Sequence, residues 1–367
     1  MPNMLVTGGA GFIGANLVRW WMDRHPSDRL VVLDSLTYAG NLKSIEDLLA
    51  DPRLEFVHGD IANDELVESL LREHSLNTIV HLAAESHVDR SITGPDAFID
   101  TNVIGTHSLL KAARRVWNDG ESWKPHRFHH VSTDEVFGSL TNDDPAFCEE
   151  TPYAPNSPYS ASKAASDHLV RAYHHTFGLA VTTTNCSNNY GPYQFPEKLI
   201  PLMLLNILSG KALPVYGDGM NIRDWLFVND HCYGIELALQ KGTAGETYCL
   251  GGNNEQPNIL IVKTLCSMLQ ERFEADPSLR ERYPESPASR GAQNEELISY
   301  VTDRPGHDQR YAINASKALN ELGYKPQETF ETGFARTIDW YLSNEQWWGE
   351  VMDGSYRNWI EENYEAR

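Results

Sequence analysis

A glycine-rich run near the start of the chain limits the fold more than any other feature of the sequence. Residues 7–14 read T-G-G-A-G-F-I-G; they follow an apolar run at 4–6 and open an amphipathic stretch at 11–23. Gly8 and Gly11 let the backbone approach a pyrophosphate, and Gly14 lets the helix pack closely on the strand. The helix N-terminus then offers N–H groups and a positive dipole end. The run predicts a dinucleotide-binding turn, and a glycine-rich turn without a ligand is the alternative.

An acidic residue further along the chain indicates which dinucleotide binds. Asp34 ends the next apolar run and lies about 20 residues after Gly14, where such motifs place a ribose-binding carboxylate. A carboxylate at that point accepts a hydrogen bond from the ribose 2′-hydroxyl and repels a 2′-phosphate. The sequence therefore predicts NAD rather than NADP.

Strand-like and helix-like segments alternate through the first half of the chain. The strand-like runs lie at 4–6, 30–33, 54–57, 78–82, 128–131 and 181–185. The helix-like stretches lie at 11–23, 64–73, 97–116 and 159–177. This alternation predicts βαβ units in an α/β protein, with a Rossmann-type doubly wound parallel sheet.

Prolines and glycines become frequent after residue 188, which indicates a smaller C-terminal substrate-binding domain. We expect an NAD-binding domain from residues 1–187 and 221–250, interleaved with a substrate domain from 188–220 and 251–367. The runs at 225–228 and 247–250 are expected to return to the main sheet. The polar, proline-containing stretch 274–294 is expected to be a surface excursion.

Charge and cysteine content exclude several classes of partner. The chain has 30 Lys and Arg against 51 Asp and Glu, a formal net charge of −21. This field repels nucleic acid and anionic membranes, and the most apolar stretch, 199–208, is too short to cross a bilayer. Five cysteines without a C-x-x-C spacing indicate free thiols in a reducing compartment. We expect a cytoplasmic protein without a signal peptide or a metal.

Two motifs carry the expected chemistry. Tyr159 and Lys163 form Y-x-x-x-K on a predicted helix, so phenol and ammonium share a face. A nearby Lys⁺ and a positive nicotinamide would lower the pKa of the Tyr159 phenol toward neutrality. Residues 132–138 read S-T-D-E-V-F-G, which places Asp134 and Glu135 at the end of a strand, where ligands bind in open sheets. A solvated helix face and a turn with two surface acids are the alternatives.

The glycine spacing resembles that of the extended short-chain dehydrogenase/reductases, and a closer resemblance covers nearly the whole chain. The stretches that carry it are L-A-A-E-S-H-V-D at 82–89, T-D-E-V-F-G at 133–138, Y-S-A-S-K at 159–163, N-C-S-N-N-Y-G-P at 185–192, P-E-K-L-I-P at 196–201, R-D-W at 223–225 and D-R-P-G-H at 303–307. They are similar to the dTDP-glucose 4,6-dehydratase family. Phe137 replaces the tyrosine that this family usually has, which removes no assigned catalytic group.

The resemblance implies roles for named residues. The implied catalytic residues are Thr133, Asp134, Glu135, Tyr159 and Lys163. The implied NAD-binding residues are Gly8, Gly11, Phe12, Ile13, Gly14, Asp34, Ser35, Leu36, Thr37, Asp60, Ile61, Leu82, Ala83, Ala84, Ser86, Thr101, Tyr159, Lys163 and Asn189. The implied nucleotide-sugar-binding residues are Ser86, Thr133, Asn188, Lys198, Leu199, Pro214, Val215, Tyr216, Arg223, Asn258, Asp303, Arg304 and His307. For each arginine alone, a surface ion pair is the alternative.

The family's reaction would use these groups in order. Tyr159 would remove the O4 proton as C4 loses hydride, Glu135 would take the C5 proton, and Asp134 would protonate the departing C6 hydroxyl. We expect burial beside negative charge to raise the pKa of Asp134, because an acid must hold its proton. The resemblance also implies a homodimer through helices at 97–116 and 159–177.

Three alternatives stay open at this stage. A 4-epimerase would share the cofactor site but would not need Asp134 and Glu135. Another nucleotide-sugar 4,6-dehydratase, of the GDP-mannose or CDP-glucose type, would differ in the nucleotide it binds. A non-catalytic NAD-binding sensor would keep the glycines but tend to lose Tyr159 and Lys163.

Overall fold

Seven parallel strands form the main sheet of the computed structural model, which describes residues 3–118, 123–303 and 307–352. The strands follow the order β10-β6-β5-β4-β1-β2-β3, so the chain reverses direction along the sheet between β1 and β4. This order confirms the predicted Rossmann-type doubly wound sheet. The strand bounds are β1 Asn3–Thr7, β2 Arg29–Asp34, β3 Leu54–His58, β4 Thr78–His81, β5 Arg127–Thr133, β6 Val181–Cys186 and β10 Thr247–Leu250.

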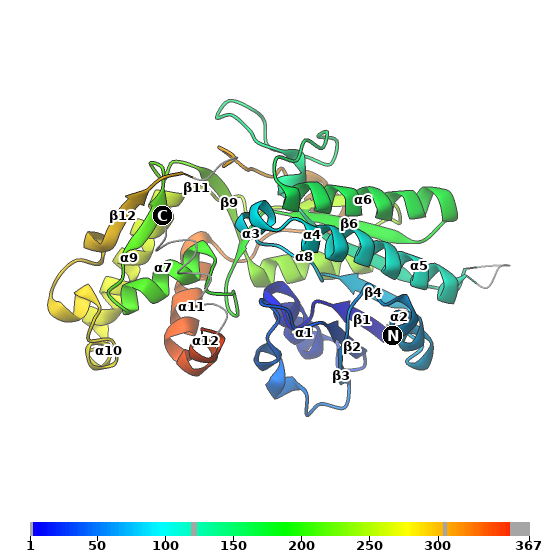
Figure 1. The fold of residues 1–367 in the computed structure, drawn as a ribbon, viewed down its shortest axis with the longest axis horizontal. Helices are drawn as coiled ribbons and strands as arrows, with labels where there is room; N and C mark the ends of the chain where they lie inside the picture. Colours follow the sequence, from blue (N-terminus) through cyan, green and yellow to red (C-terminus); the bar gives the residue numbers. More distant parts are fainter. Residues whose placement is uncertain (1–2, 119–122, 304–306, 353–367) are drawn as a thin grey trace.

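Helices cover both faces of this sheet (Figure 1). One face carries α2 (Asp64–Glu73), α5 (Thr106–Trp117) and α6 (Pro158–Phe177), and the other carries α1 (Phe12–Arg24) and α8 (Val228–Lys241). Side chains of β1 alternate between the two interfaces: Leu5 packs under α2 and α5, whereas Met4 and Val6 pack under α1 and α8. Because both faces are buried, β1 and β2 are nearly continuous apolar runs, whereas the equally buried β5 and β6 contain His, Ser, Thr and Asn residues.

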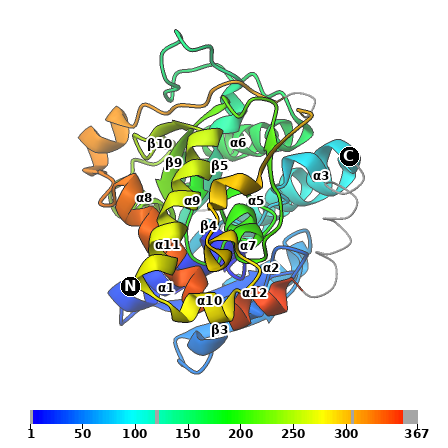
Figure 2. The same ribbon diagram turned by 90° about the vertical axis from the view of Figure 1, so that its left-hand side faces the viewer.

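A second group of elements lies beside the main sheet, at the left of Figure 1, and faces the viewer in Figure 2. Its strands form a three-stranded sheet, β11-β9-β7, and a pair, β12-β8. The strand bounds are β7 Asn188–Tyr190, β8 Leu213–Tyr216, β9 Ile222–Phe227, β11 Glu255–Pro257 and β12 Ile298–Val301. The helix bounds are α7 Leu199–Leu208, α9 Asn258–Ala275, α10 Ser278–Arg282, α11 Phe330–Ser343 and α12 Glu345–Val351.

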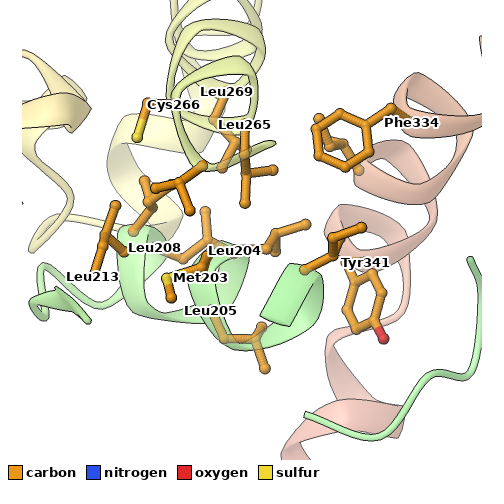
Figure 3. Packing of buried hydrophobic residues seen from close by; sticks show 14 of the residues in the cluster. Met203, Leu204, Leu205, Leu208, Leu213, Leu265, Cys266, Leu269, Phe334 and Tyr341 are labelled. Carbon is orange, nitrogen blue, oxygen red and sulfur yellow. The ribbon is translucent and has the colours of Figure 1, made fainter. Parts of the chain in front are cut away.

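The core of this second group forms where α7, α9 and α11 meet (Figure 3). Leu204, Leu265 and Phe334 come from the three helices and are each fully buried. Leu204 lies on a helix that is apolar nearly all around, because Leu199–Leu208 is enclosed by its neighbours. Among the described residues, no helix is both long and apolar enough to cross a membrane.

Three segments differ from the sequence-based expectation. The run 247–250 joins the main sheet as β10, but 225–227 lies in β9, which pairs with β7 and β11 instead. The expected helix 97–116 is interrupted: α4 (Asp96–Phe98) leads into a π-helical turn (Ile99–Gly105) before α5, and α3 (Val88–Thr93) precedes them. The expected surface excursion 274–294 packs as α10 and a 3₁₀ turn, with Leu279, Tyr283 and Ala288 buried in the second core.

Candidate active site

The residues predicted to hold the cofactor converge at the carboxyl edge of the main sheet. The segments that follow its central strands border a cavity of about 380 Å³. The predicted cofactor residues that line it are Gly8, Gly11, Phe12, Ile13, Gly14, Asp34, Ser35, Thr37, Asp60, Ile61, Leu82, Ala83, Ala84, Ser86, Thr101, Tyr159, Lys163 and Asn189. Leu36 is outside this lining, and its backbone N–H donates to Oδ1 of Asp34 at 2.8 Å.

The glycine-rich turn leaves no room for side chains. Gly8 has a φ of +70°, and a Cβ there would lie 2.6 Å from the backbone N of Ala83, just beyond β4. A Cβ on Gly14 would lie 2.0 Å from the carbonyl oxygen of Gly8. No side chain caps the described N-terminus of α1, so its first N–H groups are available to an anion in the cavity. The turn therefore fits a diphosphate held by backbone groups.

Asp34 lies at the end of β2, beside this turn. Its Oδ2 accepts a hydrogen bond from the N–H of Ala10 at 2.9 Å, while Oδ1 accepts the bond from Leu36. Burial raises the pKa of the Asp34 carboxyl, and the two N–H bonds oppose that rise. Each carboxylate oxygen has a second lone pair, so Asp34 can also accept a ribose hydroxyl.

A second hollow of about 200 Å³ adjoins the cofactor cavity. The two spaces lie side by side, because they share lining residues that include Glu135, Asn188 and Asn189. The predicted substrate residues that line the second hollow are Ser86, Asn188, Lys198, Leu199, Pro214, Val215, Tyr216, Arg223, Asn258 and His307. Thr133 lines the cofactor cavity instead.

The remaining predicted substrate residues have different positions. Asp303 lies outside the lining of either space, and its Oδ1 is 2.7 Å from Nδ1 of the lining residue His307. Arg304 falls outside the described residues. Arg223 is buried, and its guanidinium donates to the carbonyl oxygens of Ile222 and Asp308 at 2.7 and 2.9 Å. These bonds hold the Arg223 cation in one orientation at the wall of the second hollow.

Tyr159 and Lys163 project from the first turns of α6, which a capping box at Ser157 fixes in place. Both side chains are buried and line the cofactor cavity, as the Y-x-x-x-K spacing predicted. Burial, followed by the charge of Glu135, raises the pKa of the Tyr159 phenol well above its usual value. In the protein alone, burial outweighs the hydrogen bond between Tyr159 and Thr133. The expected lowering of this pKa includes the charge of a bound nicotinamide, so it stays a prediction for the protein with NAD.

Thr133, Asp134 and Glu135 lie where β5 ends. Thr133 begins a 3₁₀ turn (Asp134–Phe137), and its Oγ1 accepts a hydrogen bond from the N–H of Glu135 at 3.3 Å. Asp134 is 1% exposed. Burial raises the pKa of the Asp134 carboxyl well above its usual value, and the charges of Glu135 and Asp224 raise it further. The expected direction of the Asp134 pKa is confirmed.

Phe137 points away from this chemistry. It is buried, and its ring stacks on Phe147 at a centroid distance of 5.2 Å and meets Tyr153 edge-on. It lies in the core between β5 and the later part of the chain rather than in either hollow. A tyrosine hydroxyl at this position is therefore not needed for the lining of the site.

Sequence reasoning missed the part that Glu197 plays in the lining. Glu197 is 3% exposed and lines both hollows, and its Oε2 lies 3.6 Å from Nε of Arg90 and 3.8 Å from Nε2 of His87. Burial raises the pKa of its carboxyl, while Lys198 and Arg90 oppose the rise. Glu197 belongs to the stretch P-E-K-L-I-P at 196–201, which contributes to the family resemblance. An acid next to a lysine is typical of an exposed surface, so the residue types alone do not predict that Glu197 lines the site.

Fold and site together define an extended short-chain dehydrogenase/reductase: a Rossmann-type sheet, a glycine turn with an acid after β2, and a Tyr/Lys pair beside an adjoining second hollow. The family model described as GDP-mannose 4,6 dehydratase matches residues 5–337. The dTDP-glucose 4,6-dehydratase of Shigella flexneri is 52% identical over 374 residues, covering 99% of each chain. That of Xanthomonas campestris is 55% identical over 359 residues, covering 97% of this chain and 98% of the relative.

A solved structure agrees with these sequence matches. The dTDP-glucose 4,6-dehydratase from Streptomyces venezuelae, crystallised with NAD bound, superimposes with a TM-score of 0.84 at 47% identity. The superposition covers 95% of this chain and 99% of that one. The chain belongs to the dTDP-glucose 4,6-dehydratases, within the broader 4,6-dehydratase family that the model describes.

Proposed function

We propose that this protein converts dTDP-glucose to dTDP-4-keto-6-deoxyglucose and water, with NAD as its resident cofactor. The observation that carries this function is the adjacent pair Asp134 and Glu135 at the cofactor cavity, with Glu135 also lining the substrate hollow. Tyr159 and Lys163 stand in the same cavity. One site therefore holds the groups for a carbon oxidation and for a dehydration.

The protein's own groups fit NAD. The tight turn at Gly8 and Gly14 receives the diphosphate, and Asp34 accepts the ribose hydroxyl beside Ala10. A second phosphate on that ribose would face the Asp34 carboxylate, which disfavours NADP. When bound, NAD accepts the hydride from C4 of the sugar and later returns it to C6, so the overall reaction involves no net oxidation.

The first step oxidises C4 of the sugar. Tyr159 removes the O4 proton as the hydride leaves C4, and the new bond is the C4 carbonyl. Because burial and Glu135 raise the pKa of Tyr159, its phenolate needs a cation close by. The Lys163 ammonium, one helical turn further along the same face of α6, is the protein's own source of that cation.

The second step eliminates water across C5 and C6. Glu135 takes the C5 proton, which the C4 carbonyl makes acidic, and Asp134 gives a proton to the C6 oxygen as the C–O bond breaks. The raised pKa of Asp134 keeps that proton in place before the step. Tyr159 gains one proton from O4 and Asp134 loses one proton to the departing water, so the protein's proton count is unchanged by these two steps. C5 regains a proton when C6 is reduced.

The adjacent acids distinguish this function from its rivals. A 4-epimerase needs the Tyr159 and Lys163 pair but no acid and base for C5 and C6. A non-catalytic NAD sensor needs neither pair. For the nucleobase, identity above 50% to dTDP-glucose 4,6-dehydratases favours thymidine over the GDP-mannose and CDP-glucose types.

The substrate would lie across the second hollow. Arg223 and Arg304 suit the diphosphate because a guanidinium binds two oxygens at once, and Pro214, Val215 and Tyr216 suit the base. The expected division assigned 221–250 to the cofactor part, but Arg223 lies in β9 and lines the substrate hollow. Residues 1–187 and 228–250 would therefore hold the cofactor, and residues 188–227 and 251–367 the nucleotide sugar. His307, fixed by Asp303, supports this arrangement at the edge of Tyr216.

The protein would act as a homodimer in the cytoplasm. Ile92, Ile99 and Ile104 are 45–49% exposed on α3 and the π-helical turn that leads into α5, beside α6. Large exposed apolar side chains on neighbouring elements are typical of an interface between subunits. All five cysteines are free, which supports a reducing compartment. A monomeric mass at micromolar concentration would contradict the dimer.

The experiment that tests the function is incubation of the purified protein with dTDP-glucose and, separately, with GDP-mannose, CDP-glucose and UDP-glucose. We expect a 4-keto-6-deoxy sugar from dTDP-glucose and no net production of reduced cofactor. Formation of a C4 epimer, or no reaction with any of the four, would overturn the proposal.

A further inference from the structure

A fully buried carboxylate outside the described chemistry gathers hydrogen bonds from several elements behind the active site. Asp167, on α6, is 5% exposed. Its Oδ2 accepts bonds from Oγ of Ser132 at 2.9 Å and from the hydroxyl of Tyr153 at 2.8 Å. Its Oδ1 lies 3.0 Å from Nε2 of His130. With Nδ2 of Asn185 at 3.4 Å, these partners join β5, β6 and the segment before α6.

This carboxylate is an anion. Burial acts to raise the pKa of Asp167, but the hydrogen bond with His130, the charge of Lys163 and the bond from Ser132 outweigh it, so this pKa is lowered. Burial and the Lys163 cation lower the pKa of His130, against the hydrogen bond and charge of Asp167, and this direction favours the neutral ring. In a neutral ring that donates from Nε2, Nδ1 carries no proton. Nδ1 of His130 is buried and has no hydrogen-bond partner, which fits this tautomer because no N–H is left without an acceptor.

Lys163 needs a balancing charge. Its side chain is 5% exposed, and its ammonium donates to the carbonyl oxygen of Val131 at 2.8 Å. A carbonyl carries no full charge, and a buried ammonium without an anion nearby releases its proton. Asp167 lies four residues after Lys163, so both project from one face of α6 about 5–6 Å apart at Cβ.

We propose that Asp167 is a positioning residue for C4 oxidation: its carboxylate is the counter-charge that keeps Lys163 cationic, and it anchors the end of β5. The anchor acts through Ser132, the residue before Thr133, and through Asn185, whose amide also donates to the carbonyl oxygen of Thr133 at 3.0 Å. Asp167 touches neither hollow, so it acts only through these neighbours.

The charge balance predicts a direction for the pH dependence. Burial already lowers the pKa of Lys163, and the charge of Asp167 is the largest influence that opposes this lowering. Removing that charge lowers the pKa of Lys163 further, so the ammonium is lost at a lower pH. An opposite charge at this range is worth about 1–3 pKa units. Other titratable groups face the Lys163 and Asp167 pair. They are Tyr159 and Cys186 at the cavity, His81 on β4, His130 on β5, and Tyr153 before α6.

The test compares Asp167→Asn with the wild-type holoenzyme in single turnovers with dTDP-glucose, following absorbance of the reduced cofactor across a pH series. We expect the alkaline limb of the C4-oxidation rate to move down by about one pH unit or more. A residue with only a structural role would lower the rate or the melting temperature without moving that limb. An unmoved limb in the folded variant overturns the proposal.

A second pair of variants covers the outcome that Asp167→Asn does not fold. Tyr153→Phe removes one donor to the Asp167 anion, so less of the carboxylate's charge is offset and more of it acts on Lys163. The alkaline limb should then move to higher pH, opposite to its movement in Asp167→Asn. Tyr248→Phe is the matched control, because its buried hydroxyl donates to Glu321, away from the site, at 3.1 Å. Equal profiles for Tyr153→Phe and Tyr248→Phe would overturn the proposal.

This inference rests on the proposed dehydratase reaction, and the two fail in different ways. If the proposed function is wrong, the wild-type holoenzyme gives no transient of reduced cofactor with dTDP-glucose. If the role of Asp167 is wrong, the wild type reacts, and the variants show the same pH dependence of the C4-oxidation rate as the wild type.

Discussion

Replacing Glu135 by Gln separates the two halves of the proposed reaction. Glutamine keeps the size of the side chain and leaves the backbone bond from residue 135 to Oγ1 of Thr133 in place. It cannot accept the C5 proton. Tyr159 and Lys163 lie on a different element, α6, so C4 oxidation should continue while elimination stalls.

The magnitude follows from the loss of one positioned base. Such a loss costs about 10²–10⁴-fold in rate, which corresponds to about 3–5 kcal/mol of transition-state stabilisation. The charge of Glu135 is the second cause of the raised pKa of both Tyr159 and Asp134. Its removal lowers both pKa values, so C4 oxidation in the variant should extend to lower pH than in the wild type.

The assay is a turnover in heavy water with product analysis by mass spectrometry and absorbance. The variant should show a persistent signal of reduced cofactor, slow deuterium uptake at C5 and a 4-keto sugar that keeps its C6 oxygen. Glu150→Gln is the matched control, because Glu150 is exposed and outside both hollows. Formation of 4-keto-6-deoxyglucose by Glu135→Gln at the wild-type rate would refute the assignment of the base.

Three further variants test the cofactor site, the first step and the fold. Tyr159→Phe should abolish the transient of reduced cofactor, lowering its rate by about 10²–10⁴-fold, as stopped-flow absorbance would show. Gly14→Ala places a Cβ 2.0 Å from the Gly8 carbonyl oxygen and should lose bound NAD on purification, whereas Gly349→Ala, with open space around it, should retain it. Leu204→Ala removes a fully buried side chain and should lower the free energy of unfolding by about 2–5 kcal/mol in urea titrations.

The central sheet was predictable because its signal is local. β1, β2 and β4 are buried on both faces, so their apolar runs appear in the sequence without reference to the rest of the chain. The glycine turn was predictable for a similar reason. The close approaches at Gly8 and Gly14 exclude side chains, and only glycine satisfies them.

The remaining differences arise from contacts between distant segments. The run at 225–227 has the composition of a sheet strand, but pairing with β7 and β11 decides which sheet it joins. The stretch 274–294 contains too few apolar residues to predict burial, yet Leu279, Tyr283 and Ala288 fit against α9 and its neighbours. No periodicity within either stretch contains that information.

The pKa of Tyr159 also depends on contacts that the sequence alone does not reveal. Spacing correctly placed Tyr159 and Lys163 on one face, and on that basis alone a cation next to a phenol lowers the pKa of the phenol. The protein adds two effects that spacing does not report, burial and the charge of Glu135, and both raise the pKa of the Tyr159 phenol. In the proposed mechanism, the site would depend on two charges near Tyr159: Asp167 would keep Lys163 cationic, and NAD bound in its oxidised form would supply a positive charge that lowers the pKa of the phenol. Tyr159 would then remove the O4 proton most readily when the bound cofactor is oxidised, which is also the only form that can accept the hydride from C4.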